Sequence, residues 1–129
     1  MQEELKPKDK VKDIEFEIEF YEKILVEKPD FTDCAQVLAG LYTKVGKYQE
    51  GLKLDKRLCE LLSENPTVFY NLACSHSLLG NIDQSLGALK KSIALGFRDF
   101  DFISKDPDLT NLRLDGRFSD IVSQSRNKK

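Results

Sequence analysis

The chain of 129 residues has one histidine, no tryptophan and no long apolar run. The lone His76 excludes any site that needs two histidines, and the apolar stretches are far shorter than the ~20 residues that cross a bilayer. The 20 basic and 22 acidic residues give a net charge of -2 without a basic block, so neither nucleic acid nor membrane insertion is expected. Because glycine-rich phosphate loops and nucleophile arrangements are also missing, we predict no catalytic residues, no metal site and no cofactor.

The sequence contains few cysteines, and their spacing matches no paired cysteine motif. Cys34, Cys59 and Cys74 are odd in number, and none forms a Cys-x-x-Cys motif. They are predicted to be small buried hydrophobes in a reducing compartment. Residues 1–13 are highly charged and lack the apolar centre of a secretory signal. The sequence therefore predicts a cytoplasmic location.

Apolar and glycine positions recur when the chain is shifted by about 34 residues against itself. The matched positions include Leu38 with Leu72, Ala39 with Ala73, Gly46 with Gly80, and Leu52 with Leu86. One period earlier, Ile14 and Ile18 continue the series. A fixed period of this length indicates a solenoid, in which each unit buries its apolar face against its neighbours.

Each copy is predicted to contain two helices. They cover about 32–45 and 48–62 in one copy, and about 66–79 and 82–95 in the next. Asn65 and Asn81 are predicted N-caps, and Gly46, Gly80 and Gly96 are predicted helix exits. Because the internal loops are very short, the paired helices must be antiparallel.

This pattern resembles the tetratricopeptide repeat, in the bacterial type that ends in a C-terminal capping segment. The residues that carry the resemblance are Phe69, Leu72, Ala73 and His76 in one copy, and Leu38, Ala39 and Tyr42 in the other. Ala35 is small where the family has a large residue, and Glu17 and Leu58 are large where it has small ones. The resemblance implies an all-α, right-handed α-solenoid of about 2.5 antiparallel helix pairs.

The predicted organisation is a charged N-terminal arm over 1–12, a single domain over 13–122 and a polar tail over 123–129. The domain comprises a half repeat (13–29), two repeats (32–65 and 66–97) and capping helices (98–122). The capping helices are predicted to cover the open end with Leu109, Leu112, Phe118, Ile121 and Val122. The acidic set of Asp99, Asp101, Asp106 and Asp108 lacks the spacing of a calcium loop, so helix caps and solvated charges are expected.

Residues 14–20 alternate between apolar and acidic side chains, which is typical of a strand. The 34-residue register favours a helix instead. A helix leaves Phe16 and Phe20 one turn apart on a second face. Two explanations stay open: residues 1–12 fold over this face, or another copy of the chain associates with it.

The resemblance also implies a concave groove lined by the first helix of each pair, and a non-catalytic module that binds a protein or peptide there. The predicted groove residues are Asp33, Gln36, Gly40, Thr43, Lys44, Thr67, Tyr70, Asn71, Cys74 and Ser77. Tyr70 is the expected aromatic anchor, His76 is expected to pack in the interior, and the sparse charge predicts a modest salt dependence. The alternative function is a homo-oligomeric assembly protein that associates through Phe16 and Phe20 or through the groove.

Overall fold

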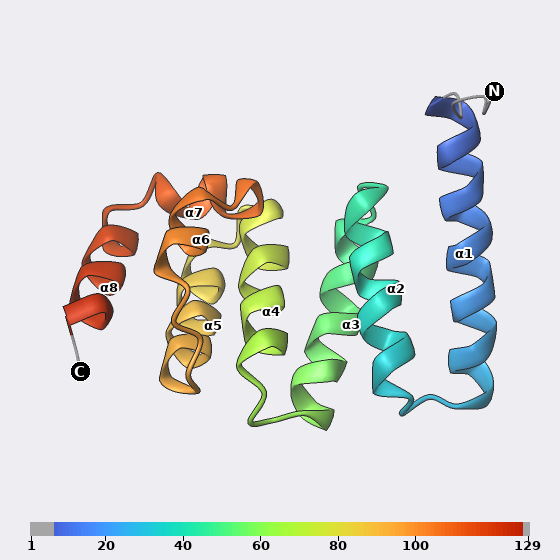
Figure 1. The fold of residues 1–129 in the computed structure, drawn as a ribbon, viewed down its shortest axis with the longest axis horizontal. Coiled ribbons are helices and arrows are strands. Elements are labelled where there is room, and N and C mark those ends of the chain that lie inside the picture. The colour runs from blue at the N-terminus through green and yellow to red at the C-terminus, as the bar shows by residue number, and fades with distance from the viewer. Residues whose placement is uncertain (1–6, 128–129) are drawn as a thin grey trace, which may run out of the picture.

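A computed structural model describes the backbone of residues 7–127 and the side chains of residues 12–127. Within these residues the chain is helical and contains no strand, which confirms the all-α class. The elements are α1 (Pro7–Glu27), α2 (Thr32–Lys44), α3 (Tyr48–Leu61), α4 (Pro66–Leu78), α5 (Ile82–Ala94), α6 (Phe100–Lys105), the short 3-10 helix η1 (Pro107–Leu109), α7 (Thr110–Arg113) and α8 (Gly116–Asn127). They follow one another in a row with α1 and α8 at opposite ends (Figure 1). No helix of the described chain combines the length and apolar character needed to cross a membrane.

Helices α2 to α5 form two packed pairs that repeat the same plan. Helix α2 packs on α3 and α4 packs on α5, while α3 and α4 join the two pairs. The first helices begin at Thr32 and Pro66, and the second helices begin at Tyr48 and Ile82, so both spacings equal 34 residues. The period seen in the sequence is therefore also the period of the helix boundaries.

Glycine closes the turn inside each pair. Gly46 and Gly80 have φ angles of 79° and 77°, in the left-handed region that only glycine adopts without strain. The following amide then bonds back to the helix at 2.8 Å in both turns, Lys47 to the Tyr42 carbonyl and Asn81 to the His76 carbonyl. This shared bond pattern reverses the chain sharply and makes the paired helices antiparallel.

The two predicted N-caps have different outcomes. The Asn65 side chain accepts hydrogen bonds from the amides of Thr67 and Val68 at 2.8 and 3.3 Å, which confirms it as the cap of α4. Asn81 precedes α5, but its side chain makes no cap bond. Its amide nitrogen instead lies 3.2 Å from His76 Nδ1. Asn81 therefore occupies the predicted N-cap position, but its side chain contacts the buried imidazole and does not cap the helix.

The C-terminal segment closes one end of the row. The predicted capping residues pack in one apolar cluster with α4 and α5: Leu109, Leu112, Phe118, Ile121 and Val122. Asp99 and Asp106 accept bonds from the amides of Phe102 and Asp108, so both are helix caps as expected. The cluster covers the apolar face that α5 would otherwise expose.

The predicted boundaries at both ends need correction. Helix α1 begins at Pro7 and α8 continues to Asn127, so residues 7–12 are not an arm and 123–127 are not a tail. Residues 1–6 and 128–129 lie outside the described part of the chain. The strand alternative for 14–20 is also wrong, because these residues lie within helix α1, where Ile18 packs against Leu38 and Tyr42 of α2.

We predict that Leu58→Ala and Leu89→Ala each lower the free energy of unfolding by about 2–5 kcal/mol, because both side chains are fully enclosed. Leu72→Ala should cost less, since Leu72 is only half-buried at the edge of the core. Urea denaturation measures all three. Val26→Ala on the exposed face of α1 is the control, and an equal loss there would contradict the assigned core.

Candidate functional site

A groove of about 560 Å³ lies between the two helix pairs and the C-terminal segment. Helix α2 supplies one wall and α4 the other, α3 contributes one acidic side chain, and the C-terminal segment supplies the remainder. The lining residues are Gln36, Ala39, Gly40, Thr43, Lys44, Asp55, Thr67, Tyr70, Asn71, Cys74, Ser75, Phe97, Phe102, Asp106 and Asp108. The groove therefore combines polar, aromatic and acidic surface from four parts of the chain.

Most of the predicted groove residues lie in this lining. They are Gln36, Gly40, Thr43, Lys44, Thr67, Tyr70, Asn71 and Cys74. Gly40 has no atom within 4 Å of the position a Cβ would take, so it keeps the α2 wall open. Asp33 is exposed near the start of α2 and is not part of the lining.

Ser77 does not face the groove, and its assignment there was wrong. It is fully buried, its hydroxyl accepts the Leu112 amide at 3.2 Å, and its carbonyl accepts the Asn111 side-chain amide at 2.9 Å. These bonds fix α7 on α4. The C-terminal segment therefore covers the part of α4 that the repeat pattern assigns to the concave surface.

Tyr70 lies at the centre of the groove but is only 4% exposed. Its ring stacks on Phe97 with centroids 4.3 Å apart and an interplanar angle of 2°. Its hydroxyl donates to Asp106 Oδ2 at 2.5 Å. Burial and the hydrogen-bonded carboxylate raise the pKa of Tyr70, so the phenol stays protonated. The expectation of an accessible aromatic anchor at Tyr70 was wrong, because the C-terminal segment already uses this side chain.

Phe102 on α6 is the exposed aromatic of the groove. Half of its surface is accessible, and its ring lies 5.8 Å from the ring of Tyr70 at a tilt of 44°. Sequence reasoning missed it because α6 lies outside the 34-residue repeat. The only signal was its place in the short aromatic run from Phe97 to Phe102.

Asp55 is a buried acid at the α3–α4 contact. It is three residues after Leu52 and three before Leu58, so it shares their buried helix face. Its carboxylate accepts the Ser75 hydroxyl at 2.5 Å. Burial raises the pKa of Asp55 to about 6, and the bond from Ser75 opposes this shift. An acid at apolar spacing was the signal that could have identified this residue.

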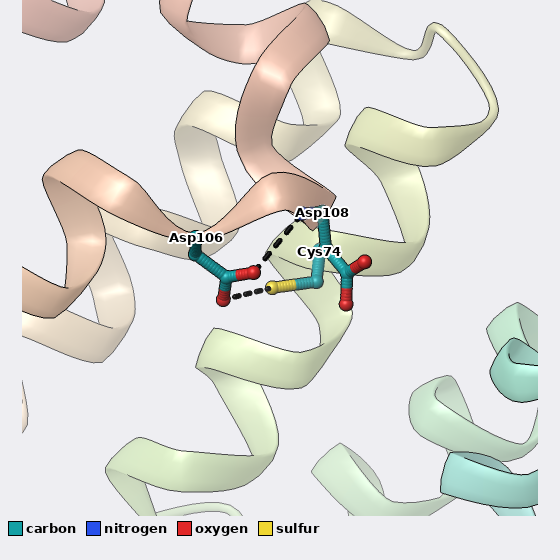
Figure 2. A group of neighbouring side chains, drawn as sticks. All are labelled: Cys74, Asp106 and Asp108. Carbon is teal, nitrogen blue, oxygen red and sulfur yellow. Dashed lines mark hydrogen bonds between the residues drawn. The ribbon is translucent and has the colours of Figure 1, made fainter.

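Three possible metal ligands also meet at the groove. The Cys74 sulfur and the carboxylates of Asp106 and Asp108 lie within 4.8 Å of one another (Figure 2). Hydrogen bonds explain this arrangement, since the thiol donates to Asp106 at 3.8 Å and Asp106 accepts the Asp108 amide at 3.0 Å. Burial, followed by the nearby carboxylates, raises the pKa of Cys74. The thiol therefore keeps its proton at neutral pH, and the absence of a metal site stays a prediction.

We predict that Asp55→Asn stabilises the protein at neutral pH. Folded Asp55 holds its proton up to a pKa of about 6, whereas an unfolded aspartate loses it near pH ~4. Below the unfolded pKa, Asp55 is protonated in both states and the parent protein has its full stability. The free energy of unfolding then falls as the pH rises from there through the folded pKa. An asparagine is always neutral and still accepts the Ser75 hydroxyl. The variant should therefore exceed the parent by about 2–3 kcal/mol at a pH of about 7.5, and match it at a pH of about 4.

Chemical denaturation at the two pH values measures this difference. Asp120→Asn removes an exposed carboxylate from α8 and serves as the charge-matched control. A stability gain that is the same at both pH values would show that Asp55 is not the titrating group.

No protein-family model matches the chain. The chain is similar to a chloroplastic protein from Arabidopsis thaliana, with 35% identity over an alignment of 89 positions, and the match covers 64% of this chain and 26% of that protein. The chain thus spans about a quarter of the length of the curated relative that it matches.

Proposed function

We propose that this chain is a tetratricopeptide-like, right-handed solenoid that binds a partner peptide in its groove and has no catalytic role of its own. The groove between α2, α4 and the C-terminal segment carries this proposal. Support for the repeat family comes from the 34-residue spacing of the helix boundaries and from the glycine turns that repeat with it. A partner protein is the expected ligand class, since the lining mixes polar donors and acceptors with apolar surface.

The groove suits an extended peptide better than a small molecule. It is an open trough between helices, and Gln36, Thr43, Thr67 and Asn71 place side-chain donors and acceptors along it. An extended main chain needs such partners at intervals. With two complete helix pairs the contact area is small, so we expect an affinity of roughly micromolar Kd.

The proposed compartment remains the cytoplasm. The free thiols of Cys34, Cys59 and Cys74 support a reducing environment. The name of the Arabidopsis relative assigns that protein to the chloroplast.

We predict that Gly40→Trp weakens peptide binding without unfolding the protein. The added ring enters open space on the α2 wall, and Gly40 has ordinary helical geometry. The test uses random short peptides displayed on phage, selected on the full chain and measured by fluorescence anisotropy. Gly40→Trp should weaken the selected peptides by about tenfold or more.

Gly87→Trp is the matched control, because Gly87 on α5 is equally open and lies outside the groove. It should bind like the parent chain. Selected peptides that bind Gly40→Trp with undiminished affinity, or an absence of selected peptides, would overturn the peptide-binding function.

We infer self-association through α1 as a second candidate function, from one specific observation. Phe16 and Phe20 lie one turn apart on α1 and are 72% and 53% exposed. Residues 7–12 continue α1 as helix and therefore cannot fold back over them. Helix α1 stands at the end of the row, where a second copy has access (Figure 1).

We predict that Phe16→Glu converts a dimer to a monomer if this face joins two copies, because a buried charge without a partner opposes association. Light scattering after size exclusion gives the mass. Leu114→Glu, at an exposed apolar position near the opposite end, should leave the mass unchanged. A monomeric parent chain at high concentration would exclude this candidate.

A further inference from the structure

The groove carries more negative charge than the groove residues that were predicted from the repeat pattern. Asp55, Asp106 and Asp108 line it, against a single cation at Lys44. Within residues 12–127, no ion pair joins these three carboxylates to a basic side chain. Arg113 donates to the backbone carbonyls of Ile103 and Asp106 instead.

The three acids differ in what they offer a partner. Asp55 is buried and accepts the Ser75 hydroxyl. Asp106 is buried and accepts hydrogen bonds from the Tyr70 hydroxyl, the Cys74 thiol and the backbone amide of Asp108. Asp108 is only half-buried, and no hydrogen bond to its carboxylate occurs within residues 12–127. Asp108 is therefore the carboxylate that faces an incoming group, while the other two strengthen the negative field around it.

Asp108 is held close to a second carboxylate. A ligand oxygen of each residue lies within 4.8 Å of the other, and of the Cys74 sulfur (Figure 2). Burial, followed by the charge of Asp106, raises the pKa of Asp108. Two like charges at this separation repel each other, and a cation placed beside them relieves the repulsion.

An exposed aromatic ring lies in the same groove. Phe102 is connected to the acids through Tyr70, whose ring lies 5.8 Å from Phe102 and whose hydroxyl reaches Asp106. A half-exposed ring and an unpaired carboxylate in one trough match a long cationic side chain. Its methylene stem packs on the ring and its charged head reaches the carboxylate.

We propose that the groove selects partner segments that present a lysine or arginine, with the stem of that side chain against Phe102 and its charged head at Asp108. This inference rests on the proposed peptide-binding function and names the chemistry of the partner. It also replaces the expectation of modest salt dependence, which assumed a groove of sparse charge. Binding should weaken as the salt concentration rises, because part of the attraction is Coulombic.

The experiment uses the phage-selected peptides and the full chain. Each selected peptide is resynthesised with its arginines replaced by citrulline, which has nearly the same size, or its lysines by acetyllysine, and both changes remove the charge. We expect at least one cationic position whose neutralisation weakens binding by about tenfold. Asp108→Asn should weaken the parent peptide similarly and leave the neutralised peptide unchanged, because the two changes remove the same interaction.

Asp120→Asn on α8 changes the net charge equally, and it should leave the affinity intact. Phe102→Ala should weaken the cationic peptide as well, and circular dichroism verifies that each variant keeps its helix content. Peptides that lose binding in Gly40→Trp but tolerate both neutralisation and Asp108→Asn would overturn this inference and leave the groove function standing. If no selected peptide depends on Gly40, the proposed function fails and this inference fails with it.

Discussion

The bond from Tyr70 to Asp106 is the interaction on which the groove depends. It joins α4 to the C-terminal segment across 36 positions of the sequence. The stacking of Phe97 on the same ring adds a second attachment, and Ser77 fixes α7 farther along α4. Without this docking, the trough between the helix pairs would lose the wall that supplies Phe102, Asp106 and Asp108.

Buried polar groups join the helix pairs without leaving unsatisfied atoms. Every buried side-chain nitrogen or oxygen in the described residues has a hydrogen-bond partner. Ser85 and Ser92 donate to the carbonyls of Ala73 and Pro66, both at 2.7 Å. Small hydroxyl side chains at these positions let α5 approach α4 closely, and the bonds offset the cost of their burial. Ser75 with Asp55 performs the same role between α3 and α4.

The two ends of the row are treated differently. At the C-terminal end, an apolar cluster from α7 and α8 covers α5. At the N-terminal end, α1 buries Ile18 against α2 but leaves Phe16 and Phe20 exposed. This asymmetry follows from the packing partners, because α7 and α8 both pack on α5, whereas α1 packs on α2.

The local structure was determined by the sequence to a large extent. The boundaries of α2 to α5, the exits at Gly46 and Gly80, the cap at Asn65 and the apolar closing set at Leu109 and Leu112 all followed from spacing and backbone preference. These features depend on residues within a few positions of one another, or on an exact repeat, and both leave a readable pattern.

The tertiary structure alone decided which side chains the groove offers. The repeat register placed Tyr70 and Ser77 on an open surface, but the C-terminal segment buries both. The same segment brings Phe102 and Asp108 into the groove. Such contacts join α4 to residues that lie more than 30 positions away and outside the 34-residue pattern. No periodicity in the sequence therefore predicts them. They form because the apolar end of the helix row must be covered, and the path of the covering segment is set by packing and by the hydrogen bonds of Tyr70, Ser77 and Asp106.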